Sequence, residues 1–147
     1  MLLIGIKNTA SQVVLADGII GLGNVYRRYC KKNNCGVRTF ETTSTGVSLQ
    51  HEGIYHITGV FVATGNDVGT ITVQLLENGT AIDGAFASST IATADTELTT
   101  LVVDYYVLVD SACLLGKTST VAKNISFANT GVDATFTSVV VNVDKVV

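Results

Sequence analysis

The stretch Gly53–Ala63 reads GIYHITGVFVA and predicts a β-strand that is apolar on both of its faces. Successive side chains of a strand point to opposite sides, so Tyr55 and Phe61 occupy one face, and Ile54 and Val60 the other. A two-layer sandwich covers only one face of each sheet with its core. The second apolar face therefore needs a cover from outside the chain, and the simplest cover is another copy of the same chain.

Two further segments repeat this two-sided pattern, Leu101–Val109 and Val139–Val141. In Thr70–Leu75, by contrast, apolar and polar residues alternate, which is typical of a strand with one buried and one hydrated face. The two-sided strands thus predict self-association through one sheet. The predicted interface comprises Ile54, His56, Val60, Val62, Val102, Asp104, Tyr106, Leu108 and Val140.

The composition indicates one all-β domain of 147 residues. Hydrophobic residues make up 47% of the chain and charged residues 14%, which excludes a disordered protein. Proline and tryptophan are absent, and no segment has a convincing helical period. Short apolar runs separated by Gly/Asn/Asp turns predict strands near 2–6, 12–16, 19–29, 36–42, 47–50, 54–64, 69–76, 85–90, 97–109, 123–128 and 134–145. We expect residues 1–147 to form a single domain, with basic N-terminal strands and a hairpin insert in 1–50 and the jelly-roll core in 51–147.

Four motifs, in this order, resemble a known family. They are ASQVVLA at Ala10–Ala16, GIYHI at Gly53–Ile57, LENGTAI at Leu76–Ile82 and ISFANTG at Ile125–Gly131. The sequence resembles the C-terminal domain of collagen-like spore-surface glycoproteins, a branch of the tumour-necrosis-factor and complement-globular-head superfamily. The resemblance implies an antiparallel two-sheet jelly-roll sandwich that forms a compact trimer, with the sheet of the first, central and last strands around the threefold axis.

The setting suggested by the sequence is a virus particle. No Gly-X-Y stalk precedes the domain, and the run after Met1 lacks the basic segment of a signal peptide. Similar trimers occur among head-fibre and decoration proteins of tailed bacteriophages. We therefore expect a non-enzymatic virion structural protein on the capsid exterior, made in the host cytoplasm, which contacts the major capsid protein or another virion protein. Host surface glycans are a further candidate partner, and the alternative is a trimeric adhesion domain of a bacterial cell or spore surface.

Positive charge is concentrated near the N-terminus. Residues 1–50 contain six Lys/Arg and two acidic residues, whereas residues 51–147 contain three and ten. The basic insert could be a solvated hairpin, a docking surface for the capsid or a neighbouring subunit, or a nucleic-acid contact, although a pI near 5.2 argues against nucleic acid. Neither nucleic acid nor a membrane is expected as a partner. The candidate docking residues are Arg27, Arg28, Lys31 and Lys32.

No cofactor or catalytic site is expected. Cys30 and Cys35 could form a disulfide across a hairpin or remain free thiols, and two cysteines alone do not make a zinc site. The five-residue spacing of His51 and His56 would place them on opposite faces of a strand. Asp104 lies inside an apolar run, where it could face the trimer axis, pair with a cation of a neighbouring subunit, or be a carboxylate at a strand edge.

Overall fold

The computed structural model describes residues 2–29, 39–110 and 122–147, and these residues form twelve strands and no helix. Every strand pairing is antiparallel. In order across the first sheet lie β10 (Leu98–Val109), β7 (Gly53–Gly65), β12 (Ala134–Lys145), β1 (Leu2–Asn8) and β4 (Asn24–Tyr29), with β2 (Gln12–Val14) paired to β12. Across the second sheet lie β5 (Phe40–Thr42), β6 (Gly46–Leu49), β11 (Lys123–Asn129), β8 (Gly69–Glu77) and β9 (Thr80–Ile91), with β3 (Gly18–Ile19) paired to β11.

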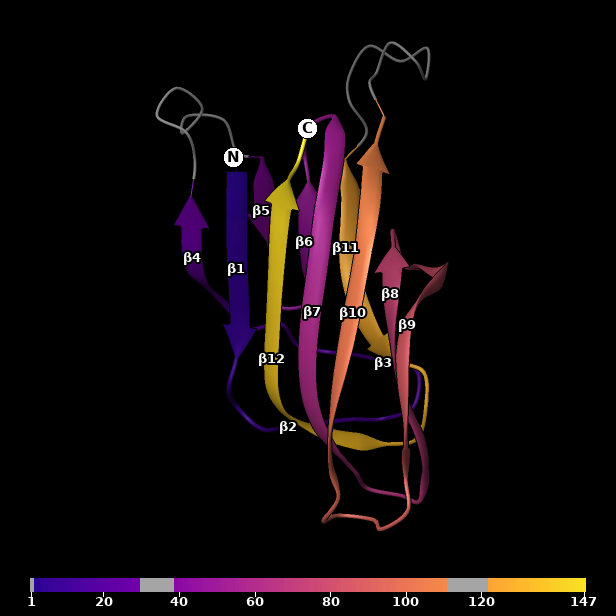
Figure 1. The fold of residues 1–147 in the computed structure, drawn as a ribbon. Helices are drawn as coiled ribbons and strands as arrows, with labels where there is room; N and C mark the ends of the chain where they lie inside the picture. Colours follow the sequence, from indigo (N-terminus) through magenta and orange to yellow (C-terminus); the bar gives the residue numbers. More distant parts are fainter. Residues whose placement is uncertain (1, 30–38, 111–121) are drawn as a thin grey trace.

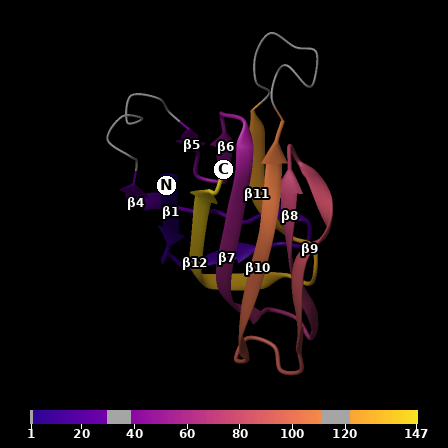
Figure 2. The same cartoon turned by 45° about the horizontal axis from the view of Figure 1, so that its top comes forward.

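The two sheets stack as a jelly-roll sandwich, which confirms the predicted fold class (Figures 1 and 2). β1 and β12 lie side by side in the first sheet, with Leu2 opposite Lys145. The strands near both ends of the chain thus belong to the same sheet as the long central strand β7.

Aromatic rings from both sheets form the centre of the core. Phe61 of β7 and Phe136 of β12 are fully buried, and so is Phe127 of β11. The Phe61 ring centroid lies 4.9 Å from that of Phe127 and 6.3 Å from that of Phe136. Because these rings interlock across the two layers, the inner faces of the sheets are held in a fixed register.

The core also holds a buried polar residue, Asn129, at the end of β11. Its Nδ2 donates to the carbonyl oxygens of Val14 and Val132 at 3.1 and 2.7 Å, and its Oδ1 accepts from the Gly131 amide at 3.1 Å. The Asn129 carbonyl accepts a further bond from the Asp17 amide at 2.6 Å. One side chain thus joins β2 to the turn between β11 and β12.

Two predicted strands differ from the structure. The segment 19–29 is not one strand, because β3 ends at Ile19 and β4 begins at Asn24 in the other sheet. Gly23 between them has a φ of +81°, a conformation that side chains other than glycine rarely adopt. This glycine breaks the strand and lets the chain cross from one sheet to the other.

The strand predicted at 85–90 is longer, since β9 begins at Thr80. The hairpin turn lies at Asn78-Gly79, and Gly84 lies within the strand at a φ of +79°. A register shift between Gln74 and Leu76 marks the bulge, and the Gln74 side-chain amide donates to the Ile82 carbonyl at 2.8 Å. The Asp83-Gly84 pair, expected between strands, instead forms a bulge inside one.

Candidate subunit interface

The outer face of the first sheet carries all nine residues predicted to form the interface. Their burial alternates along β7, β10 and β12 with that of the core residues, so they share the side that points away from the second sheet. β7 contributes Ile54, His56, Val60 and Val62; β10 contributes Val102, Asp104, Tyr106 and Leu108; and β12 contributes Val140.

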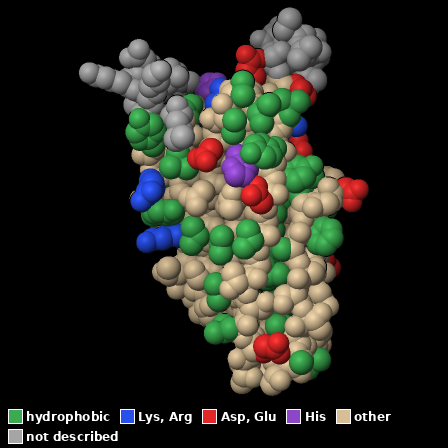
Figure 3. All heavy atoms as spheres, in the orientation of Figure 1, with side chains coloured by type: hydrophobic (Ala, Val, Ile, Leu, Met, Phe, Trp, Pro, Cys, Tyr) green, Lys and Arg blue, Asp and Glu red, His purple; other side chains and the backbone are tan. Residues whose placement is uncertain are grey.

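Apolar side chains on this face are exposed to solvent. The exposed fraction is 53% for Val102, 59% for Tyr106 and 52% for Leu108, and Ile54 is exposed at 37%. Figure 3, which views this side of the molecule, shows hydrophobic side chains gathered over β7 and β10. The outer surface of the two-sided strands is therefore not covered by the described part of the chain, and it offers an apolar surface for association.

A polar cluster lies within the apolar surface. His56 Nε2 and Asp104 Oδ1 lie 2.5 Å apart, within hydrogen-bonding distance, and the His56 ring stacks on Tyr106 with centroids 4.6 Å apart. On the other side of His56, Asp144 of β12 is its register partner. Asp104 therefore pairs with a group of its own chain, and with a side-chain exposure of 58% it remains accessible to a second partner.

The opposite edge of the same face is basic and is organised by Tyr26 of β4. The Tyr26 hydroxyl donates to Asn142 Oδ1 at 3.0 Å, and a Cβ added at Gly5 would meet the Tyr26 ring at 2.8 Å. Lys7 Nζ and Arg27 Cζ lie 5.3 and 5.8 Å from the ring centroid, within cation–π range. Tyr26 was not among the predicted interface residues; its position directly before Arg27 and Arg28 was the only signal, since the glycine that accommodates its ring is 21 positions away in the sequence.

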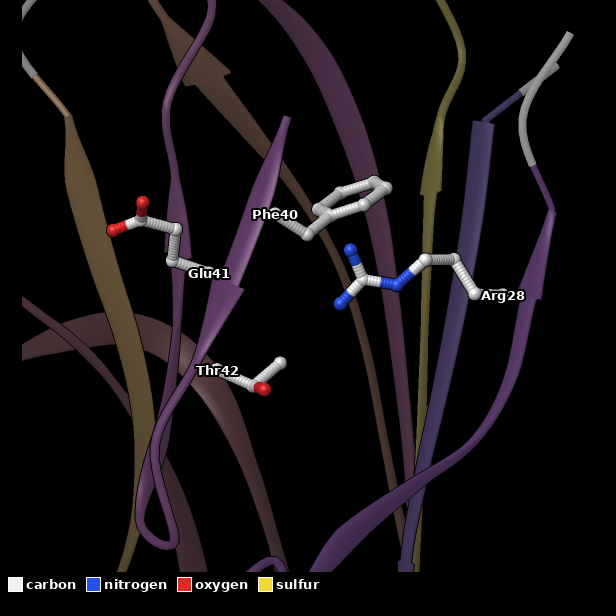
Figure 4. A pocket seen from close by; sticks show the side chains of 4 residues that line it. All are labelled: Arg28, Phe40, Glu41 and Thr42. Carbon is white, nitrogen blue, oxygen red and sulfur yellow. The ribbon is translucent and has the colours of Figure 1, made fainter. Parts of the chain in front are cut away.

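The predicted docking residues separate onto two sides of β4. Arg27 pairs in register with Gly5 and shares its outer face, whereas Arg28 pairs with the buried Ile4 and points toward the second sheet. In Figure 4, Arg28 extends from β4 toward Phe40 and Thr42 of β5, while Glu41 points away from it. These four residues line a pocket of about 450 Å³. Lys31, Lys32, Cys30 and Cys35 lie outside the described residues.

His51 and His56 do not share a strand, because His51 precedes β7. The His51 carbonyl accepts a bond of 2.6 Å from the Tyr55 hydroxyl, and burial raises the pKa of Tyr55 to about 12 although this hydrogen bond lowers it. Within residues 2–29, 39–110 and 122–147, no group of three or more His, Cys, Asp or Glu is placed to hold a metal ion. Nor does this part of the chain include a helix long and apolar enough to span a membrane.

The fold is the TNF-like jelly roll, the class that contains the tumour-necrosis-factor ligands and the complement globular heads. The globular domain of zebrafish complement 1qA has a TM-score of 0.62 at 7% identity, with 100% of this chain and 98% of that one covered. Murine APRIL gives 0.65 at 10% identity, covering 99% and 98%. Vertex protein P5 of phage PRD1 gives 0.59 at 12% identity, covering 99% and 97%. No protein-family model and no curated protein sequence matches the chain.

Proposed function

We propose that this chain is a non-enzymatic structural subunit that assembles as a homotrimer and decorates the outside of a virus particle. The observation that carries the proposal is the exposed apolar face of β7 and β10, formed by Ile54, Val102, Tyr106 and Leu108. Exposed apolar side chains on a sheet face are poorly suited to catalysis, which needs a cleft with convergent polar groups. They are well suited to association between subunits.

The size of the face supports a stable assembly. With strands about 4.8 Å apart the five-stranded face is roughly 20 Å wide, and at about 3.3 Å per residue its three long strands β7, β10 and β12 extend about 40 Å, whereas β1 and β4 are shorter. Specific interfaces bury about 800 Å² per partner. The surface is large enough for that area, and at about 25 cal/mol/Å² its apolar part yields a gain comparable to the cost of association, about 4–15 kcal/mol.

The virion setting rests on two points. Vertex protein P5 of PRD1, a virion protein by its name, shares the fold over nearly all of both chains. The sequence also resembles phage head-fibre and decoration proteins. In this role the basic edge with Arg27 and Arg28 would face the capsid or a neighbouring subunit, and the loops would face solvent and any host glycan.

Two measurements test the proposal. Light scattering of the purified chain is expected to give about three times its mass of 15.4 kDa. Immunogold electron microscopy of virus particles from the source of the gene is expected to label their outer surface. A chain that stays monomeric at micromolar concentration contradicts the assembly.

The second measurement also separates the alternative role. Label on intact bacterial cells or spores, with none on particles, would replace the virion role with surface adhesion. Such a result would not contradict the proposed trimer, because the resemblance to adhesion domains implies the same assembly.

A further inference from the structure

The two edges of the outer face carry opposite charges in the same row of residues. Strand pairing places Arg27, Gly5, Asn142, Thr58 and Asp104 side by side, one from each strand from β4 to β10. All five belong to the outer face, so the row begins with a guanidinium and ends with a carboxylate. In Figure 3 the Lys and Arg side chains of this face lie over the β4–β1 edge, and acidic and His side chains lie over β12, β7 and β10.

The neighbouring rows extend this polarity. Two residues along the strands on one side, the row runs from Asn24 of β4 and Lys7 of β1 to Val102 of β10. On the other side, Asp144 and His56 lie next to Tyr106 of β10. Positive charge therefore gathers on β1 and β4, and carboxylates gather on β12 and β10.

Arg27 and Asp104 cannot pair within one subunit. Four strand spacings of about 4.8 Å separate them by roughly 19 Å. That separation exceeds the screening length of about 8 Å at physiological ionic strength, so the two groups barely attract each other across the sheet. A second molecule, by contrast, can bring its Arg27 to Asp104.

A ring of three copies supplies such a contact. Subunits related by a threefold axis meet through two different patches, because the surface that one copy presents is met by another surface of the next. β4 and β10 are the outermost strands of the five-stranded path, with β2 paired separately to β12. A heterologous ring that joins β10 of one copy to the β4–β1 side of the next brings opposite charges together at every interface.

We infer that a second copy of this chain occupies the β4–β1 edge, and that Arg27 of one subunit pairs with Asp104 of the next around the ring. This inference rests on the proposed trimer and specifies its interface. Tyr26 is the positioning residue, because its ring lies within cation–π range of Arg27 while its hydroxyl is held by Asn142. His56 similarly orients Asp104 through the contact between its Nε2 and Asp104 Oδ1.

A charge-swap cycle tests the pairing. Arg27→Glu and Asp104→Lys each place like charges at all three interfaces, and each is expected to raise the concentration at which the trimer half-dissociates by roughly tenfold. The double variant restores opposite charges, and its midpoint is expected within about threefold of the wild-type value. Sedimentation of a dilution series gives the midpoints. If the trimer stays intact at the lowest concentration that sedimentation can measure, subunit exchange between fluorescently labelled trimers gives the dissociation rates instead.

The matched control uses the adjacent residue. Arg28 differs from Arg27 by one position but points to the other face of β4, so Arg28→Glu combined with Asp104→Lys has the same net charge and no expected rescue. Circular dichroism checks that each variant folds. A neutral pair, Arg27→Gln with Asp104→Asn, provides a gentler version, which is expected to lose the salt dependence of wild-type assembly.

The outcomes are distinguishable. Rescue by the first double variant and not by the control supports the pairing. If the wild type is a trimer but the effects of the two single substitutions simply add in the double variant, the pairing is overturned and the trimer remains. The charges would then only protect the sheet edges from pairing with other chains. A monomeric wild-type chain overturns the proposed function and this inference together.

Discussion

Single polar residues hold this sandwich together at places where the backbone would otherwise lack partners. Asn129 is the clearest case, because it is fully buried and binds three backbone groups from two separate segments. A buried carbonyl or amide that loses its partner costs about 1–3 kcal/mol. The stability of the region around β2 therefore depends on one side-chain amide.

We predict that Asn129→Ala lowers the free energy of unfolding by about 2–4 kcal/mol, because it leaves the Val14 and Val132 carbonyls without this donor. Urea denaturation followed by circular dichroism measures the change. Asn24→Ala, at an exposed position, is the control and should change the free energy by about 0.5 kcal/mol or less. Equal losses in the two variants would contradict the role given to Asn129.

Tyr55 makes stability depend on pH in the alkaline range. Its folded-state pKa is raised from 10.0 to about 12, so the unfolded chain releases the phenolic proton at a lower pH than the folded chain. The stabilisation is fully present below pH 10 and is lost as the pH rises toward 12, at up to about 1.4 kcal/mol per pH unit. Urea titrations at several pH values should show this slope in the wild type and a shallower one in Tyr55→Phe. Identical slopes would show that Tyr55 titrates normally.

At the scale of elements, the sequence predicts strand existence better than strand ends. The alternation in Thr70–Leu75 and the two-sided pattern of Gly53–Ala63 identify β8 and β7, because burial on a known number of faces leaves a clear period. The break after Ile19 was missed, since the residues around it are as apolar as a strand. What divides the segment is the close approach of Gly23 to the β1 backbone, a tertiary contact that no local pattern contains.

The same limit applies to the candidate interface. The apolar positions on β7 and β10 follow from periodicity. The packing of the Tyr26 ring against Gly5 and the row from Arg27 to Asp104 depend instead on strand order and register. Strand order brings together residues that are far apart in the sequence. It therefore had to come from the structure.

Gly23 provides a test at this scale. Gly23→Ala is expected to destabilise the fold by at least about 2 kcal/mol, because the new Cβ would overlap the Lys7 carbonyl oxygen as well as adopt a positive φ. Gly79→Ala is a matched control with nearly the same φ and no atom within 4 Å of the added Cβ, so only the backbone cost of about 1–2 kcal/mol applies. Thermal unfolding of both variants measures the difference, and equal losses would rule out the steric contact.

At the scale of the whole molecule, we expect the uncovered apolar sheet face to make the proposed assembly the main determinant of behaviour in solution. Tyr106→Ser combined with Leu108→Ser removes two exposed apolar side chains from the face of each subunit. Burying each such side chain contributes about 1.5–3 kcal/mol, so the trimer midpoint should rise at least a hundredfold. Light scattering over a dilution series measures it.

The control for this variant removes the same kind of side chain elsewhere. Val13 and Leu15 are exposed at 63% and 62% but do not belong to the face of β7 and β10. Val13→Ser with Leu15→Ser should therefore leave the mass in solution unchanged. A loss of trimer in this control and not in the first variant would place the interface on the other end of the sandwich.

The pairing of β1 with β12 also determines when the chain can fold. β1 precedes the other strands of the first sheet in the sequence, yet its neighbour β12 follows them all, so the first sheet cannot close until β12 has emerged from the ribosome. Contacts between such distant segments slow folding to the range of about milliseconds to seconds. During that delay the exposed apolar strands of nascent chains are accessible to one another, and the time that β12 takes to emerge affects how many molecules fold rather than aggregate.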